Sequence, residues 1–180
     1  MLRRSASHRF LQPALAMALA LMAASPFANA EEGQPVLVPG ERFPMLDLED
    51  QFGDEHAVPG EATLIIFSGS KQADDDLSGT LGEIAGDALR AGEIIYLSDI
   101  SRMPGLITKL IAMPALKDRD YPVTLIREEG VADTLPATDG CVTLFQLSGE
   151  GEVHRIDEAC EPDELRDALT ADGSAPGEQP

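Results

Sequence analysis

Hydrophobic positions along the chain form two kinds of pattern, which predict strands and helices. Continuous apolar runs rich in β-branched residues at 63–67 and 94–97 are typical of central strands buried on both faces. Apolar residues at helical spacing predict a helix that ends at Gly92, and Pro104 and Pro162 suit the first turns of two further helices. The apolar members of the three helices are Leu77, Leu81, Ile84, Ala85 and Ala88, then Leu106, Ile107, Leu110 and Ile111, and finally Leu165, Ala168 and Leu169.

Shorter patterns predict strands at 43–48, 56–58, 123–126, 142–147 and 153–156. Turn residues at 50–54 and 149–151 join the first two and the last two of these strands into hairpins. The order of elements is hairpin, strand, helix, strand, helix, strand, hairpin, helix. This order predicts an α/β protein with a mixed sheet that is covered on both faces.

Residues 1–30 have the pattern of a secretory signal peptide. Arg3, Arg4 and Arg9 precede an apolar stretch from Leu11 to Ala24, and small residues follow up to an expected cleavage site between Ala30 and Glu31. The stretch is shorter than the roughly 20 apolar residues that span a bilayer. We therefore expect export to the periplasm, with no membrane span after cleavage.

The composition divides the remaining chain into one domain with two loose ends. Residues 31–39 are expected to form a flexible linker, 40–171 the domain, and 172–180 a disordered acidic tail. The full chain has a formal net charge of −19, and the leader carries three Arg and no acidic residue, so the remainder carries −22. Like charge opposes association with nucleic acids and with anionic membrane surfaces, so neither is an expected partner.

Cys141 and Cys160 are the two cysteines of the chain. In an exported protein such a pair favours a structural disulfide. If the last hairpin turns at Glu150, facing residue numbers sum to about 300, which places Cys141 opposite Ala159 or Cys160. The alternative is a redox-active pair with Cys141 as the working thiol and Cys160 as its resolving partner.

Basic residues are concentrated in one segment of this acidic chain. Half of those outside the leader lie between Arg102 and Arg127, where they form a possible partner patch for an acidic ligand or a periplasmic protein. The alternative is that they pair with acidic side chains of the same chain. The five residues are Arg102, Lys109, Lys117, Arg119 and Arg127.

Other candidate chemistry lacks a motif. His56 and His154 are far apart in sequence, and neither has the spacing of a metal site or a catalytic triad. Asp74, Asp75 and Asp76 do not match a calcium loop, and we interpret them as acidic caps at the start of a helix. No metal and no cofactor is therefore predicted.

The element order, together with Gly40-x-x-Phe43-Pro44 and the run from Asp50 to Gly53, resembles a thioredoxin-like domain of the peroxiredoxin type. The resemblance implies a three-layer α/β/α sandwich with a mixed sheet over residues 40–171. The stretch from Asp99 to Tyr121 is similar to small periplasmic proteobacterial proteins, some of which bear the label of FAD- or FMN-containing dehydrogenases. No Gly-x-Gly-x-x-Gly motif follows a strand here, so flavin-linked oxidation is only a remote alternative.

The resemblance also identifies a missing group. In thioredoxin-like enzymes the working cysteine follows the central strand at a helix N-terminus, where the helix dipole stabilises its thiolate. The matching window from Ser68 to Asp75 contains no cysteine, and the hydroxyl of Ser70 has no redox chemistry. We therefore expect an exported module without thiol catalysis, used for binding or as an accessory protein. An atypical thiol-disulfide oxidoreductase that uses Cys141 and Cys160 is the alternative.

Overall fold

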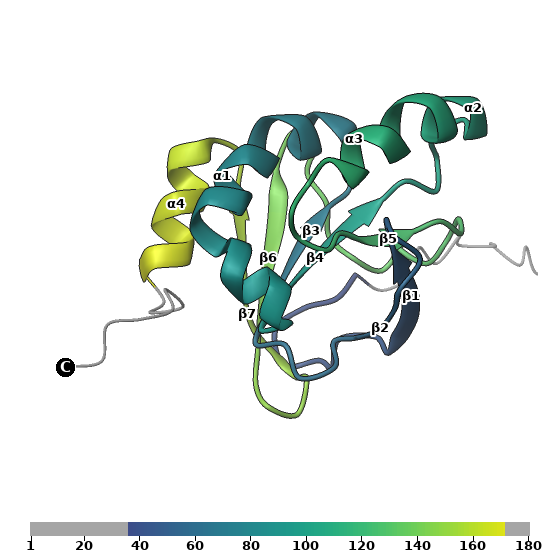
Figure 1. Cartoon of the computed structure of the whole chain (residues 1–180). Helices are drawn as coiled ribbons and strands as arrows, with labels where there is room; N and C mark the ends of the chain where they lie inside the picture. The colour runs from purple at the N-terminus through teal and green to yellow at the C-terminus, as the bar shows by residue number, and fades with distance from the viewer. Residues whose placement is uncertain (1–35, 172–180) are drawn as a thin grey trace, which may run out of the picture. The chain divides into compact units, whose positions relative to one another are not determined.

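Seven strands form one mixed sheet in the computed structural model, which describes residues 36–171 (Figure 1). The strand order is β2-β1-β5-β4-β3-β6-β7, with β3, β4 and β5 parallel and the remaining neighbours antiparallel. The strands span Leu46–Asp50 (β1), Glu55–Val58 (β2), Leu64–Ser68 (β3), Ile94–Asp99 (β4), Thr124–Ile126 (β5), Val142–Leu147 (β6) and Val153–Ala159 (β7).

The order of strands and helices agrees with the order predicted from the sequence, and the mixed α/β class is confirmed. The first strand begins at Leu46 and not at Phe43, because the backbone of Phe43 is engaged elsewhere. Its N–H donates to the carbonyl of Gly151 at 2.9 Å, and its ring packs edge-on against Phe145 with the centroids 5.3 Å apart. The chain before β1 is thereby tied to the far side of the sheet.

Helix α1 (Lys71–Ala91) is bounded by two caps that the sequence supplies. Ser70 is extended and its Oγ accepts a hydrogen bond from the N–H of Ala73, which satisfies one of the free donors of the first turn. Gly92 ends the helix in the left-handed conformation with φ 76°, and its N–H donates to the last turn. The predicted helix end is therefore confirmed.

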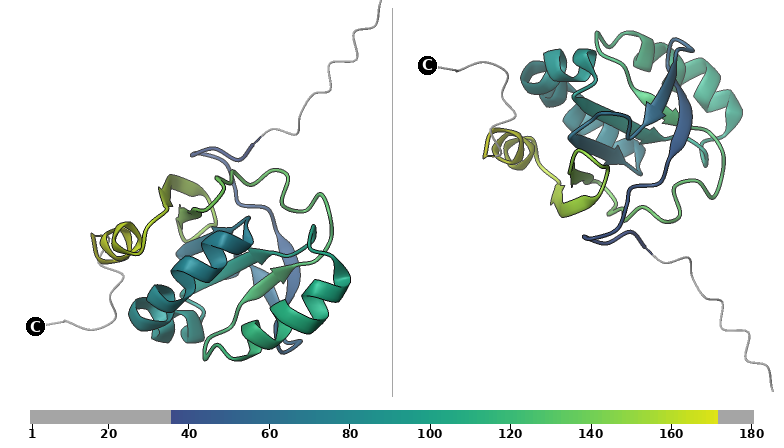
Figure 2. Two further views of the ribbon diagram at one scale, coloured as in Figure 1. Left: turned by 90° about the horizontal axis from the view of Figure 1, so that it is seen from above. Right: turned by 90° about the horizontal axis from the view of Figure 1, so that it is seen from below.

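All helices that contribute buried side chains pack on the same face of the sheet (Figure 2). Helix α4 (Pro162–Ala171) lies beside α1, and α3 (Met113–Lys117) covers the part of the sheet nearer β5. Their apolar side chains form one core with alternate residues of the central strands. Its fully buried members include Leu77, Leu81, Leu89, Tyr96, Leu125 and Leu165.

The opposite face of the sheet is covered by coil. Both faces are therefore covered, as expected, but helices cover only one of them. A second core lies there, and its members outside the strands come from the segment before β1 and from the connection between β5 and β6. Leu37 is buried in this core, and its N–H donates to the carbonyl of Thr134 at 2.7 Å. The C-terminal end of the linker expected at 31–39 is therefore packed against the domain.

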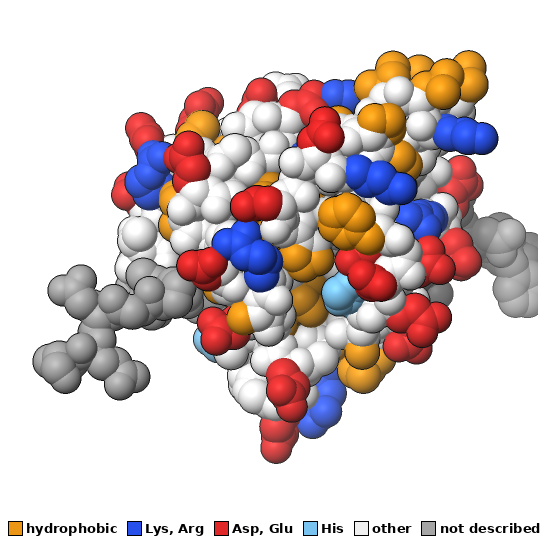
Figure 3. Space-filling model, in the orientation of Figure 1, with side chains coloured by type: hydrophobic (Ala, Val, Ile, Leu, Met, Phe, Trp, Pro, Cys, Tyr) orange, Lys and Arg blue, Asp and Glu red, His pale blue; other side chains and the backbone are white. Residues whose placement is uncertain are grey.

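The helix expected after Pro104 has an unexpected form. It consists of a short α2 (Gly105–Ile107), a π-helical segment η1 (Thr108–Ala112) and α3. The apolar side chains of α2 and η1 face solvent and not the core, with Leu106 70 % and Leu110 63 % exposed. Figure 3 shows this cluster of hydrophobic side chains at the α2 corner of the molecule.

Some expectations concern residues outside the described range. The signal peptide over 1–30, its cleavage between Ala30 and Glu31, and the acidic tail over 172–180 all lie there. Within residues 36–171, no helix combines the length and apolar character that crossing a membrane requires.

Candidate functional site

Ser70 lies within the window in which the resemblance expects the working thiol, between the end of β3 and the first turn of α1. Its Oγ accepts two backbone hydrogen bonds, from Ala73 at 3.3 Å and from Gly140 at 3.2 Å. The Ser68 hydroxyl supports the same loop by donating to the carbonyl of Ser70 at 3.0 Å. The hydroxyl of Ser70 thus joins the start of α1 to the segment that enters β6.

A disulfide between Cys141 and Cys160 lies beside this position. Cys141 follows Gly140 directly, and Val142 faces Ala159 in the β6–β7 ladder, so the next pair outward is Cys141 and Cys160. The predicted hairpin register and the pairing of the two cysteines are both confirmed. The bridge joins the start of β6 to the short segment between β7 and α4, with Cys141 buried and Cys160 exposed.

The surroundings of the disulfide are acidic. A cavity of about 450 Å³ borders it and is lined in part by Asp76, Asp139 and Glu161. Reactive thiolates occur in electropositive surroundings, since positive charge stabilises the anion. Three carboxylates oppose the formation of a thiolate here. The local charge therefore favours a structural bridge over a redox-active one.

A buried polar cluster lies on the other side of the α1 N-terminus. The carboxylate of Asp74 accepts hydrogen bonds from the hydroxyls of Tyr96 and of Ser98, the latter at 3.2 Å. The guanidinium of Arg119 lies 3.7 Å from the same carboxylate, and its carbon is 5.8 Å from the centre of the Tyr96 ring. The cluster joins α1, β4 and the loop after α3.

Protonation states in this cluster follow from burial and charge. Burial and the adjacent Asp74 carboxylate raise the pKa of Tyr96 well above its ordinary value, so its hydroxyl stays a hydrogen-bond donor. Burial alone would lower the pKa of Arg119, but Asp74 and the two tyrosines raise it more. Asp74 and Arg119 therefore form a buried ion pair, in which Nη1 of Arg119 has no hydrogen-bond partner among residues 36–171.

The interpretation of three acidic caps is correct in part. Asp74 lies in the first turn of α1, but its carboxylate is buried against Tyr96 and does not cap the helix, a role that Ser70 fills. Asp75 instead pairs with Lys71 on the surface. A signal for the cluster existed in the sequence, because Tyr96 interrupts an aliphatic strand and a buried tyrosine hydroxyl needs a partner.

The five basic residues of the possible partner patch lie in different surroundings. Three pair with acidic side chains of the same chain: Arg102 with Asp133 at 3.1 Å, Arg119 with Asp74 and Arg127 with Glu49 at 2.8 Å. Within the described part of the chain, Lys109 and Lys117 have no ion pair. Lys109 and Arg127 line the same groove.

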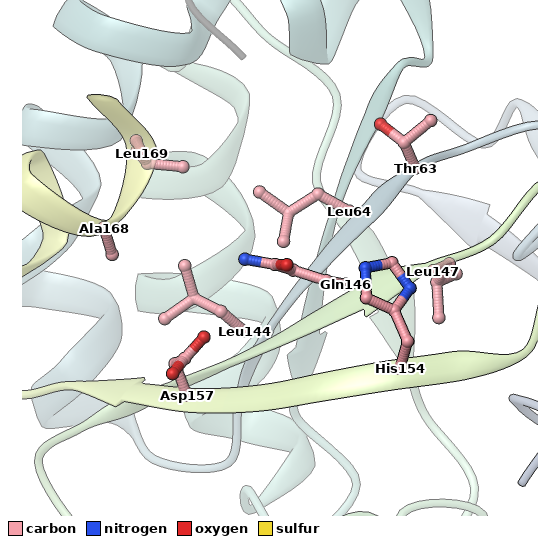
Figure 4. Close-up of a pocket in the computed structure, with 9 residues that line it drawn as sticks. All are labelled: Thr63, Leu64, Leu144, Gln146, Leu147, His154, Asp157, Ala168 and Leu169. Carbon is pink, nitrogen blue, oxygen red and sulfur yellow. The ribbon is translucent and has the colours of Figure 1, made fainter. Parts of the chain in front are cut away.

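The two histidines outside the leader lie at separate places. His56 contacts Asp50, with Nε2 and Oδ2 3.0 Å apart, at the turn between β1 and β2. His154 on β7 lines a cavity of about 240 Å³. Figure 4 shows it beside Gln146, with Asp157 further along the same strand and Ala168 and Leu169 of α4 at the other end of the lining. Residues 36–171 contain no group of three or more His, Cys, Asp or Glu side chains placed to hold a metal ion.

Comparisons with known proteins identify the fold. No family model and no curated relative matches the sequence. Among solved structures, a putative protein disulfide isomerase from Bacteroides thetaiotaomicron has a TM-score of 0.56 at 10% identity, over 78% of this chain and 91% of that one. A putative thiol:disulfide interchange protein DsbE from Chlorobium tepidum has a TM-score of 0.54 at 12% identity, over 78% and 99%.

A third structure of similar fold is that of a peroxiredoxin-like protein. The peroxiredoxin-like protein from Aquifex aeolicus has a TM-score of 0.50 at 14% identity, over 77% of this chain and 90% of that one. The label of a flavin-containing dehydrogenase is not supported, since these structures are of thiol-disulfide and peroxiredoxin-like proteins. The chain has a thioredoxin-like fold.

Proposed function

We propose that this protein is an exported thioredoxin-like module that binds a partner or ligand without catalysing thiol chemistry. The observation that carries the proposal is the loop between β3 and α1, where the resemblance expects a working thiol and the chain has Ser70, whose hydroxyl is held by the N–H groups of Ala73 and Gly140. An alcohol in two such hydrogen bonds can stabilise the loop, but it cannot accept or release electrons.

The state of the two cysteines supports the same function. Cys141 and Cys160 are joined to each other, and carboxylates surround the bridge. A disulfide that closes a loop of this length stabilises a fold by about 3 kcal/mol. Structural disulfides of this kind resist reduction by cellular thiols.

A reduction assay tests the proposal. The purified protein is expected to leave the rate of insulin reduction by dithiothreitol unchanged, because no thiolate is available at the start of α1. The Cys141→Ser variant is the matched control and should give the same rate. Acceleration by the wild-type protein that disappears in this variant would overturn the proposal and establish a thiol-disulfide oxidoreductase.

One observation favours that second candidate. The disulfide lies next to the α1 N-terminus, since the N–H of Gly140, the residue before Cys141, donates to Ser70. Titration of the bridge with thiol redox buffers, followed by alkylation and intact-mass measurement, separates the two functions. A structural bridge should remain oxidised down to about −300 mV, whereas opening at the potentials of thiol oxidoreductases near −200 mV would favour the enzyme.

Export to the periplasm is part of the proposal and is supported by the sequence of residues 1–30. The same intact-mass measurement on protein recovered from a periplasmic extract tests it, since cleavage after Ala30 would give a chain that begins at Glu31. A chain that retains the first 30 residues would contradict the expected cleavage.

A further inference from the structure

A groove of about 410 Å³ lies at the carboxyl ends of the parallel strands β4 and β5. Ile100 and Ser101 follow β4 directly, Arg127 follows β5, and the α2–η1 segment forms the opposite wall. The volume is within the range of small-molecule sites, and ligands of open α/β sheets bind outside the carboxyl ends of the strands. We call this cavity the β4–β5 groove.

The lining of the β4–β5 groove combines apolar and cationic side chains. Ile100, Met103 and Met113 supply the apolar surface, and Lys109 and Arg127 supply the positive charge. Arg127 is held in place, since it donates to Glu49 at 2.8 Å and to the carbonyl of Asp50 at 3.3 Å. Lys109 has no ion pair within residues 36–171, so its charge is available to a ligand.

The absence of acidic residues from this lining is unusual for the molecule. The chain has 32 Asp and Glu residues, yet none falls between Ile100 and Lys117. Each of four other cavities has at least one carboxylate in its lining, whereas the β4–β5 groove has none. Among these five cavities, the β4–β5 groove is therefore the one whose lining best suits a negatively charged ligand.

The wall that carries Lys109 has an uncommon backbone. Thr108 and Lys109 begin η1, and single π-helical turns occur frequently at functional sites. In this wall, Gly105, Thr108 and Lys109 face the groove, while Leu106 and Leu110 point to solvent. The helix thus presents its polar side and its cation to the groove.

From these observations we propose that the β4–β5 groove binds a small organic carboxylate with an apolar body. The chain of the ligand lies against Met103 and Met113, and its carboxylate pairs with Lys109 beside the fixed guanidinium of Arg127. The site is separate from Ser70 and from the disulfide, so it holds whether or not the cysteines prove to be redox-active.

Methionine methyl NMR tests the proposal on the full chain with hexanoate as the probe. Signals of ¹³C-labelled Met103 and Met113, assigned by substitution with Leu, are expected to shift and saturate as hexanoate is added. Met45, which is exposed and outside the groove, serves as the internal reference and should not shift. The absence of saturable shifts at Met103 and Met113 would overturn the proposal.

Matched probes and variants test each part of the recognition. Lys109→Glu should weaken hexanoate binding about tenfold, which corresponds to about 1.4 kcal/mol. Lys117→Glu makes the same charge change on a lysine outside the groove and should leave binding within about twofold, because exposed charges at a distance are screened. If 1-hexanol binds as tightly as hexanoate, the proposed recognition of the carboxylate is wrong. If acetate binds as tightly as hexanoate, the proposed recognition of the apolar body is wrong.

Discussion

Asp74 and Asp75 are adjacent in the sequence and lie in opposite environments. Asp74 is buried and accepts the hydroxyls of Tyr96 and Ser98 beside Arg119, whereas Asp75 pairs on the surface with Lys71. Sequence alone places both in the first turns of a helix and cannot separate them. The difference arises from which side of α1 faces β4, a tertiary property.

We predict that Asp74→Ala lowers the free energy of unfolding by about 3 kcal/mol, because it leaves the buried guanidinium of Arg119 without its counter-charge. Asp75→Ala is the control at the neighbouring position and should change it by less than about 0.5 kcal/mol, since exposed helix pairs contribute little. Urea denaturation followed by circular dichroism measures both. Equal effects of the two substitutions would show that the buried cluster adds no stability.

At the scale of elements, the sequence is informative wherever a periodic apolar pattern meets a cap or a turn. The run at 63–67 and the helix that ends at Gly92 are found close to their predicted limits, because burial and capping act on the same residues. The coil layer over the second face is different. It is held by single apolar residues such as Leu37 and Leu135, and isolated buried residues leave no period to detect.

The candidate site likewise has parts that the sequence predicts and a part that it does not. The missing thiol and the pairing of Cys141 with Cys160 follow from the sequence, because a window after a strand and the register of a hairpin are local properties. The β4–β5 groove does not, since it brings Lys109 of the connection between β4 and β5 beside Arg127, which follows β5. The sequence shows that Lys109 and Arg127 belong to one basic segment, but it does not show the direction of either side chain.

Substitutions in α3 and in the preceding segment η1 test the finding that the apolar side chains of η1 face solvent and not the core. Leu110 in η1 is exposed, whereas Leu116 in α3 is buried in the core. We predict that Leu116→Ala lowers the free energy of unfolding by about 2–4 kcal/mol, as for other buried leucines. Leu110→Ala should change it by less than about 0.5 kcal/mol.

Urea denaturation at two protein concentrations measures these changes. A large effect of Leu110→Ala would contradict the exposure of this face, and a dependence on protein concentration would then show that a second copy covers it.

At the scale of the whole molecule, net charge dominates the response to acid. The chain has a net charge of −19, and protonation of its many exposed carboxylates below about pH 5 reduces their mutual repulsion. Protonation of Asp50 has the opposite effect, because it removes a stabilising interaction of the folded state. It is buried at the turn between β1 and β2, and its Oδ1 accepts the N–H groups of Phe52, Gly53 and Asp54.

Burial raises the pKa of Asp50, but the hydrogen bonds from His56 and from these three amides lower it more, so the folded value lies below the unfolded one. A lowered folded pKa means that the ionised carboxylate stabilises the native state above the unfolded value, near 3.9, and that this contribution is lost as pH falls through the folded value. We predict that Asp50→Asn lowers stability by about 1 kcal/mol at pH 7. The difference from wild type should shrink below about pH 4 as the wild-type carboxylate is protonated.

Asp54→Asn is the appropriate reference for this measurement, because it removes the same charge from the same turn while leaving the Asp54 N–H to donate to Asp50. Comparing the two variants at each pH cancels the change in overall repulsion, which both share, and isolates the hydrogen-bonded carboxylate. The gap between Asp50→Asn and Asp54→Asn in urea unfolding should therefore be largest near neutrality and close as the pH falls. A gap that stays constant from pH 7 to pH 3 would mean that the geometry of the Asn side chain, and not the charge of Asp50, is responsible.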